Sequence, residues 1–180
     1  MADRKLFLEK LLEEYRKSFD ITQDYEIGGV YAAAYGYFST VSEKYVLSPK
    51  ANLWSIHGYE HILFLERDMI DDKALEDIRE LMERHMAPEL VCKGKKYPEK
   101  DHMYSYLTVA FLCEHSPAEE VLRSLEKFRY EKDYLFNFRG HTEAHLVLMD
   151  LAKGRAYANK AAKHLVAFYE NVYNGVSVIE

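Results

Sequence analysis

The sequence predicts one α+β domain, a two-layer sandwich in which helices cover one face of a mainly antiparallel β-sheet. The length of 180 residues is that of a single domain, 1–180. A composition that is 48% hydrophobic and 14% aromatic supplies a core without disulfides or metals. Segments that alternate apolar and polar residues are separated by Gly- or Pro-containing turns and by segments with helical spacing, a pattern typical of layered α+β folds.

Residues 1–20 are predicted to form a helix that packs on the rest of the domain. Apolar side chains recur there at steps of three and four residues, which places them on one stripe of a helix. The members of this stripe are Leu8, Leu11, Leu12, Tyr15 and Phe19.

Residues 30–39 are predicted to form a strand with two unlike faces. Tyr31, Tyr35 and Tyr37 point to one face, and mostly small side chains point to the other. The small face is expected to lie close under a helix. The Tyr-rich face is expected to be solvent-exposed, an interface or the wall of a pocket.

Two β-hairpins are predicted further along the chain. The first turns at His57-Gly58 and the second at Arg139-Gly140-His141, where Gly supplies the turn. Helices are expected after Asp71 or Asp72, after the capping-box sequence that begins at Ser116, and after Asn159, since each of these side chains can accept an orphan backbone N–H.

A strand–turn–helix pattern occurs three times, with strands that begin at His61, Val109 and His145. Any sheet with helices on one face produces such units, so the pattern needs no common origin. The alternative explanation is an internal ββα duplication about a pseudo-twofold axis. The first and third copies also share histidines at two equivalent offsets.

These histidines are the candidate metal ligands: His57, His61, His141 and His145. A duplication would place His61 and His145 at equivalent strand positions, where they are expected to converge and bind a divalent metal. Histidine is also ordinary at turns and strand edges, and the sequence requires no cofactor. His57 to His61 spells H-x-x-E-H, but a zinc protease needs that motif on a helix, and Gly58 favours a hairpin.

Each repeat strand ends in an acidic residue: Glu66, Glu114 or Asp150. If the three strands are neighbours, the carboxylates cluster and can bind a divalent cation or transfer protons. The alternative is that they begin helices, where a negative charge favours the N-terminal dipole.

Charge and composition restrict the partners. The net charge of −6 makes nucleic acid an unlikely partner, and the basic run from Lys93 to Lys100 is interpreted as a solvated loop. No apolar run is long enough for a signal peptide or a membrane helix, so no membrane association and a cytoplasmic location are expected. Cys92 and Cys113 are then reduced thiols.

The leading hypothesis is a non-enzymatic binding or interaction protein that forms homo-oligomers through its Tyr-rich sheet face. Tyr31, Tyr35, Tyr37 and Trp54 are the candidate interface or ligand residues, because Tyr and Trp are enriched at interfaces. The alternative is a metal-binding protein or metal-assisted hydrolase that uses His61, His145 and the strand-end carboxylates. Enzymatic activity and any small-molecule ligand are left open, since the sequence has no nucleophile elbow or phosphate-binding glycine motif.

Overall fold

The computed structural model describes residues 3–44 and 54–177, and the side chains of 3–40 and 57–176. Within these residues the strands are β1 (Asp20–Ile27), β2 (Val30–Lys44), β3 (Trp54–Arg67), β4 (His102–Cys113), β5 (Glu131–Asp133), β6 (His141–Asp150) and β7 (Arg155–Ala158). The helices are α1 (Arg4–Tyr15), α2 (Asp72–Leu81), the π-helix η1 (Met82–Val91), α3 (Glu119–Lys127), the 3₁₀-helix η2 (Lys160–Leu165) and α4 (Val166–Ser177).

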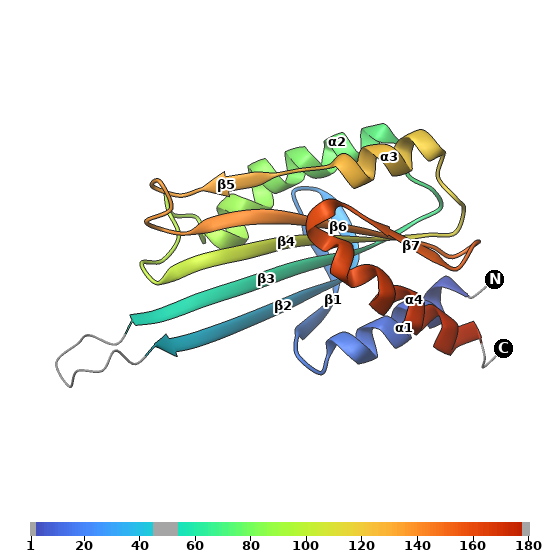
Figure 1. Ribbon diagram of the computed structural model, residues 1–180, viewed down its shortest axis with the longest axis horizontal. Helices are drawn as coiled ribbons and strands as arrows, with labels where there is room; N and C mark the ends of the chain where they lie inside the picture. Colours follow the sequence, from blue (N-terminus) through green and yellow to red (C-terminus); the bar gives the residue numbers. More distant parts are fainter. Residues whose placement is uncertain (1–2, 45–53, 178–180) are drawn as a thin grey trace.

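The strands form one open sheet in the order β1-β2-β3-β4-β6-β5, with β7 beside β6 (Figure 1). The pairs β3–β4 and β4–β6 are parallel, and the other four pairs are antiparallel. The prediction of an α+β fold with a mainly antiparallel sheet is therefore confirmed. The parallel pairs arise because α2 with η1, and then α3, carry the chain back across the sheet before the next strand.

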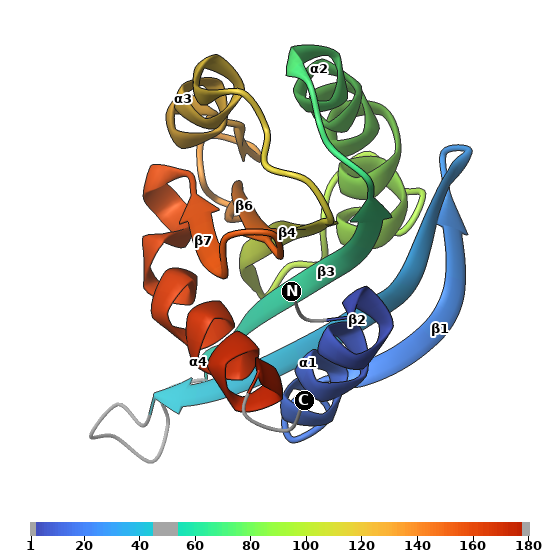
Figure 2. The same ribbon diagram turned by 90° about the vertical axis from the view of Figure 1, so that its right-hand side faces the viewer.

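Helices cover both faces of the sheet, whereas the sequence predicted helices on one face. Figure 2 shows α2 and α3 on one side and α1 and α4 on the other. Two separate apolar cores result, one under α2, η1 and α3 and one under α1 and α4. The physical reason is that β3, β4 and β6 are apolar on both faces. Ile62 belongs to one core and its neighbour Leu63 to the other, so each face needs a cover.

The two faces of β2 differ as predicted. Ala34 and Gly36 face the α1 side, and a Cβ added to Gly36 would lie 2.6 Å from Cγ2 of Ile62. Tyr35 packs instead on the core that η1 covers. Ala34 therefore shares a core with α1, but the close neighbours of Gly36 are Ile62, Ile21 and Phe19 and not a helix. The Tyr-rich face is not left free.

The predicted turn at His57-Gly58 is wrong, because β3 runs through it without a break. Gly58 serves another purpose, since the ring of Tyr104 lies across it and a Cβ would be 2.2 Å from the ring carbon Cζ. A glycine inside a strand often marks such a close approach. The second predicted hairpin exists, but its first strand is the short β5, and residues 134–138 belong to the connecting loop.

The predicted helix caps are mostly present. Asp71 accepts from the backbone N–H of Ala74 over 2.9 Å, and Asn159 accepts from that of Ala162 over 3.2 Å. The capping box at Ser116 is wrong, because α3 begins only after Ala118. None of the described helices is long and apolar enough to cross a membrane.

Candidate functional site

A row of aromatic rings crosses the η1-covered face of the sheet, from β1 to β4. Its ring centroids lie 4.4 Å apart for Tyr25 and Tyr35, 5.4 Å for Tyr37 and His61, and 5.9 Å for Tyr59 and His102. The predicted site residues Tyr35, Tyr37 and His61 are therefore neighbours. Their contact follows from the register, in which Tyr37 is paired with His61.

His61 lies at the centre of this row and is neutral at pH 7. Its Nδ1 is 2.7 Å from the hydroxyl of Tyr35, and the side chain is almost fully buried. Burial lowers the pKa of His61 to about 4, and the nearby positive charge of Lys93 acts in the same direction. The imidazole therefore serves as a neutral hydrogen-bonding group.

His102, which the sequence analysis did not select, forms a hydrogen-bonded pair with Ser105. In the pairing of β3 with β4, His57 lies opposite His102, and the next residue, Gly58, lies opposite Tyr104. Met103 is therefore an extra residue in β4, which forms a β-bulge there. This bulge puts His102 and Ser105 on the same face, with Nε2 and Oγ 2.8 Å apart. Strict alternation along β4 would place them on opposite faces, which is why the pair could not be foreseen.

The pair is held rigidly and has little room for a ligand. Nδ1 of His102 donates to the carbonyl of Arg139 over 2.7 Å, so Nε2 must accept from the hydroxyl of Ser105. The order of hydroxyl, imidazole and orienting carbonyl resembles that of an activated nucleophile. However, Ser105 is fully buried, and the adjoining cavity of about 20 Å³ holds no more than one water. The arrangement therefore joins β4 to the loop before β6.

The expected convergence of His61 and His145 does not occur. His61 is in register with Leu107, and His145 with Thr108, so the two imidazoles lie on opposite faces of the sheet. His57 pairs with His102, and His141 with Tyr104. In the part of the chain that the structure describes, no three His, Cys, Asp or Glu side chains gather in a way that holds a metal ion.

His145 stacks on Tyr106 with ring centroids 4.4 Å apart and lies edge-to-face with His164 of η2 at 5.5 Å. Its Nε2 is 3.6 Å from Glu143, and its buried Nδ1 has no partner among the described residues. Burial lowers the pKa of His145 to about 4, with a contribution from His164. The internal duplication that would relate it to His61 stays a prediction.

Two of the three strand-end carboxylates do meet, but around a cation of the chain itself. The guanidinium of Arg4 lies 3.3 Å from Glu66 and 3.4 Å from Glu114. Asp150 is buried and accepts from the backbone N–H of Lys153 over 3.1 Å. The cluster thus connects α1 to the ends of β3 and β4.

The remaining predicted interface residues are dispersed. Tyr31 is 53% exposed beside the turn between β1 and β2, where its hydroxyl donates to Asp24. Trp54 begins β3, but its side chain lies outside the described residues. Because Tyr35 and Tyr37 are half-buried, they do not form one exposed surface with Tyr31.

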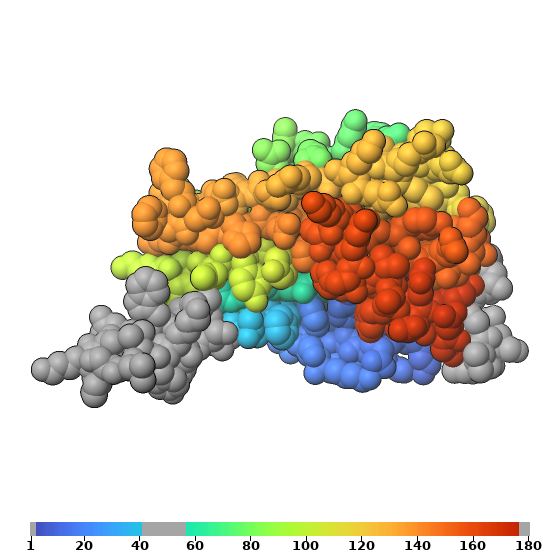
Figure 3. Space-filling model, viewed as in Figure 1, coloured from blue at the N-terminus to red at the C-terminus, as the bar shows by residue number. Residues whose placement is uncertain are grey.

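The most exposed large apolar side chains occupy the loop between β5 and β6. Phe136 is 94% exposed and Phe138 is 85% exposed, with Leu135 and Met103 beside them at 38% and 45%. These four residues are called the apolar tip. The loop projects from one end of the molecule in Figure 1 and in the space-filling view of Figure 3.

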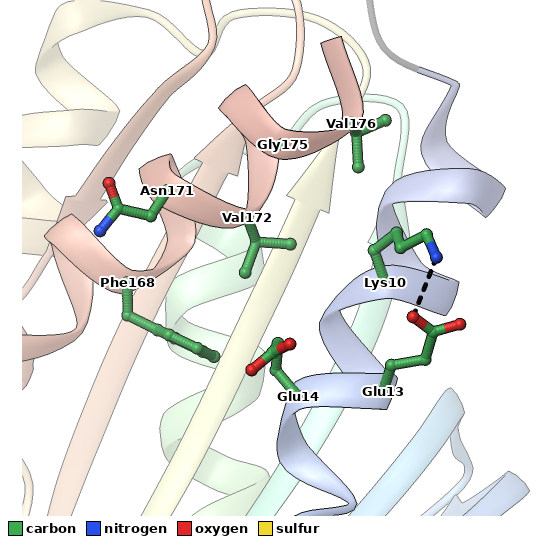
Figure 4. Close-up of a pocket in the computed structure, with 8 residues that line it drawn as sticks. All are labelled: Lys10, Glu13, Glu14, Phe168, Asn171, Val172, Gly175 and Val176. Atoms are coloured by element: carbon green, nitrogen blue, oxygen red, sulfur yellow. Dashed lines mark hydrogen bonds and ion pairs between the residues drawn. The ribbon is translucent and has the colours of Figure 1, made fainter. Parts of the chain in front are cut away.

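A groove of about 460 Å³ lies between α1 and α4, at the other end of the molecule from the apolar tip (Figure 1). Figure 4 shows Phe168, Val172 and Val176 on the α4 side, and Lys10, Glu13 and Glu14 on α1. This surface is called the α1–α4 groove. It was not predicted, because no packing of α4 beside α1 was expected. The apolar tip was not predicted because residues 134–138 were expected to form a strand, whereas they lie in a loop.

A comparison with protein families found one match, to a family described as "Domain of unknown function (DUF8052)", over residues 3–171. Comparisons with curated proteins and with solved structures found no match.

Proposed function

The chain belongs to the DUF8052 family, whose description gives no activity, and from the geometry we propose that it is a non-enzymatic interaction domain that binds a second copy of itself. The observation that carries the proposal is the exposure of Phe136 and Phe138, at 94% and 85%. Exposed apolar patches of this kind typically mark interaction sites, and aromatic side chains dominate the energetics of interfaces.

The backbone of the loop supports a role in binding. Leu135, Phe136 and Asn137 have φ angles of 51°, 52° and 68°. Left-handed conformations cost a non-glycine residue roughly 1–3 kcal/mol, and such strain clusters at functional sites. This unfavourable backbone holds two apolar rings in solvent, which gives the isolated chain no benefit. A partner that buries the rings supplies the missing stabilisation.

The α1–α4 groove is the complementary surface on the second copy. It offers apolar contacts from Phe168, Val172 and Val176 to an incoming ring. Charge adds little to this contact. Residues 93–101, which contain four lysines and only two acidic residues, lie beside the tip, since Arg139 donates to the carbonyl of Pro98 over 3.0 Å. Glu13 and Glu14 at the groove are already ion-paired with Lys10 and Lys17, so the contact is expected to rest on the apolar side chains.

The tip replaces the Tyr-rich face as the proposed interface. Tyr35 is engaged with His61 beneath η1, and Tyr37 is half-buried in the same row. A metal-assisted activity of His61 and His145 is not proposed, because the two side chains lie on opposite faces of the sheet.

Native mass spectrometry over a range of concentrations tests the proposal. The wild type is expected to form dimers and larger species, and Phe136→Ser/Phe138→Ser is expected to be monomeric. Tyr31→Ser is the matched control, because Tyr31 is an exposed aromatic residue away from the tip. A wild type that stays monomeric, or a double variant that still assembles, contradicts the proposal. Binding of the monomeric wild type to anionic vesicles, lost in the double variant, would assign the tip to a membrane surface instead.

A further inference from the structure

A hollow of about 190 Å³ opens between α1 and the η2–α4 segment, next to β3. It is lined by the aromatic residues Tyr15, Phe19 and Phe168 and by the acidic residues Glu14 and Glu60, of which Glu14 is ion-paired with Lys17. No Lys or Arg is among the described residues that line it. We propose that this hollow binds an organic ammonium ion.

Three aromatic rings border the hollow and pack on one another. Tyr15 lies edge-to-face with Phe19 at 5.1 Å and 77°, and with Phe168 at 5.5 Å and 81°. The face of an aromatic ring carries partial negative charge and attracts a cation within about 6 Å.

Glu60 supplies the charge at the bottom of the hollow. It is carried on β3 on the side of the sheet that α1 covers, and its Oε1 accepts from the hydroxyl of Thr108 over 2.6 Å. Thr108 is its only hydrogen-bond donor among the described residues, and no Lys or Arg is paired with it. Burial raises the pKa of Glu60 above the usual range of a carboxylic acid. A bound cation would offset the cost of keeping the ionised carboxylate of Glu60 away from water.

The chemistry of the walls selects the class of cation. A divalent metal prefers several oxygen ligands, whereas three aromatic rings and two carboxylates offer few of them. An alkylated ammonium group has apolar methyl groups for the rings and a charge for Glu60. The volume of about 190 Å³ admits a head group of that size and is below that of pockets for drug-sized ligands.

Isothermal titration calorimetry with tetramethylammonium chloride tests the inference, and tert-butanol serves as the uncharged probe of similar size. The wild type is expected to bind tetramethylammonium and not tert-butanol. Glu60→Gln keeps an acceptor for Thr108 and is expected to weaken binding at least about tenfold. Phe168→Leu is expected to weaken it about 2- to 30-fold through loss of the cation–π contact. Glu9→Gln, an exposed change elsewhere on α1, leaves it unchanged.

Equal heats for the two probes, no binding of tetramethylammonium, or wild-type binding by a Glu60→Gln variant with native circular dichroism would overturn the inference. Titration with choline and with phosphatidylcholine vesicles distinguishes a free ammonium ion from a lipid head group. The two proposals are separated by Phe136→Ser/Phe138→Ser, which leaves the hollow intact, and by Glu60→Gln, because Glu60 lies outside the α1–α4 groove. Phe168 lines both surfaces, so Phe168→Leu does not separate them.

Discussion

His102 donates a hydrogen bond from Nδ1 to the backbone carbonyl of Arg139 over 2.7 Å, across 37 residues of sequence. Gly140 makes this approach possible. A Cβ at that position would lie 2.2 Å from the carbonyl oxygen of Met103 and 2.7 Å from Nδ1 of His102, and the glycine has φ +74°. The contact holds the loop that carries the apolar tip against the start of β4.

Gly140→Ala is therefore expected to lower the free energy of unfolding by at least about 2 kcal/mol, from the left-handed backbone and the clash together. Urea unfolding followed by circular dichroism measures the change. Gly175→Ala is the matched control, because a Cβ there meets nothing within 4 Å and the residue is helical. This control is expected to be neutral or stabilising by up to about 1 kcal/mol. Equal stability of the two variants would show that the close approach is not needed.

The stability of the fold is expected to fall as the pH decreases from about 6.5 to about 4. His61 and His145 each have a folded pKa of about 4, below the value of roughly 6.5 for an unfolded chain. The unfolded state therefore binds more protons in this range. Stability is full above pH 6.5 and is lost toward pH 4, by up to about 1.4 kcal/mol per pH unit for each histidine.

Urea unfolding at intervals between pH 7.5 and pH 4.5 checks this slope. His61→Gln and His145→Gln are each expected to flatten it, since glutamine does not titrate. His115→Gln is the control, because His115 is exposed. Lys93 and His102 act on His61, and His164 acts on His145, so their charges are kept unchanged in all variants. A slope that survives both replacements would place the acid sensitivity elsewhere.

The parts of the fold that could be predicted are those with local causes. The small face of β2 was expected under a helix because Ala34 and Gly36 have little bulk there, and Asn159 was expected as a cap because its side chain accepts a backbone N–H. The cover on both faces could have been inferred from the apolar runs in β3 and β6, which leave no polar face. The pattern of one strand does not say which helix supplies that cover.

The candidate site was less predictable because it depends on register and on long-range contacts. One extra residue at Met103 changes which side chains share a face with Ser105, and sequence spacing gives no sign of it. In the same way, the equivalent offsets of His61 and His145 in the repeat predicted that the two side chains converge. The observed register puts them on opposite faces of the sheet. Arg4, far away in sequence, forms ion pairs with both Glu66 and Glu114.

Asn159 is expected to be among the most sensitive polar positions. Its buried amide accepts from the backbone N–H groups of Leu146 and Ala162 and donates to the carbonyls of Phe128 and Ala144. Asn159→Ala leaves all four backbone groups without this partner.

The expected loss is about 2–4 kcal/mol in the free energy of unfolding, since each buried group left unsatisfied costs about 1–3 kcal/mol and part of the cost is relieved by water. Thermal and urea unfolding measure it. Asn174→Ala, at an exposed position of α4, should change stability by less than about 0.5 kcal/mol. A loss below 1 kcal/mol for Asn159→Ala would mean that the four contacts are largely replaced by water.

Self-association through a tip and a groove makes a prediction about mixtures that a symmetric interface does not make. A head-to-tail contact uses the apolar tip of one copy and the α1–α4 groove of another. Phe136→Ser/Phe138→Ser removes the tip and keeps the groove. Gly175→Lys introduces a long cationic side chain at a groove position where a Cβ meets no other atom, and keeps the tip.

Each variant alone is expected to be monomeric in native mass spectrometry. Their mixture is expected to form a 1:1 heterodimer and nothing larger, because one intact tip and one intact groove remain and they complete a single contact. If both copies used the same surface, the variant that keeps that surface would still form homodimers on its own, and no heterodimer would form. A mixture that stays monomeric while the wild type assembles would therefore exclude the head-to-tail contact.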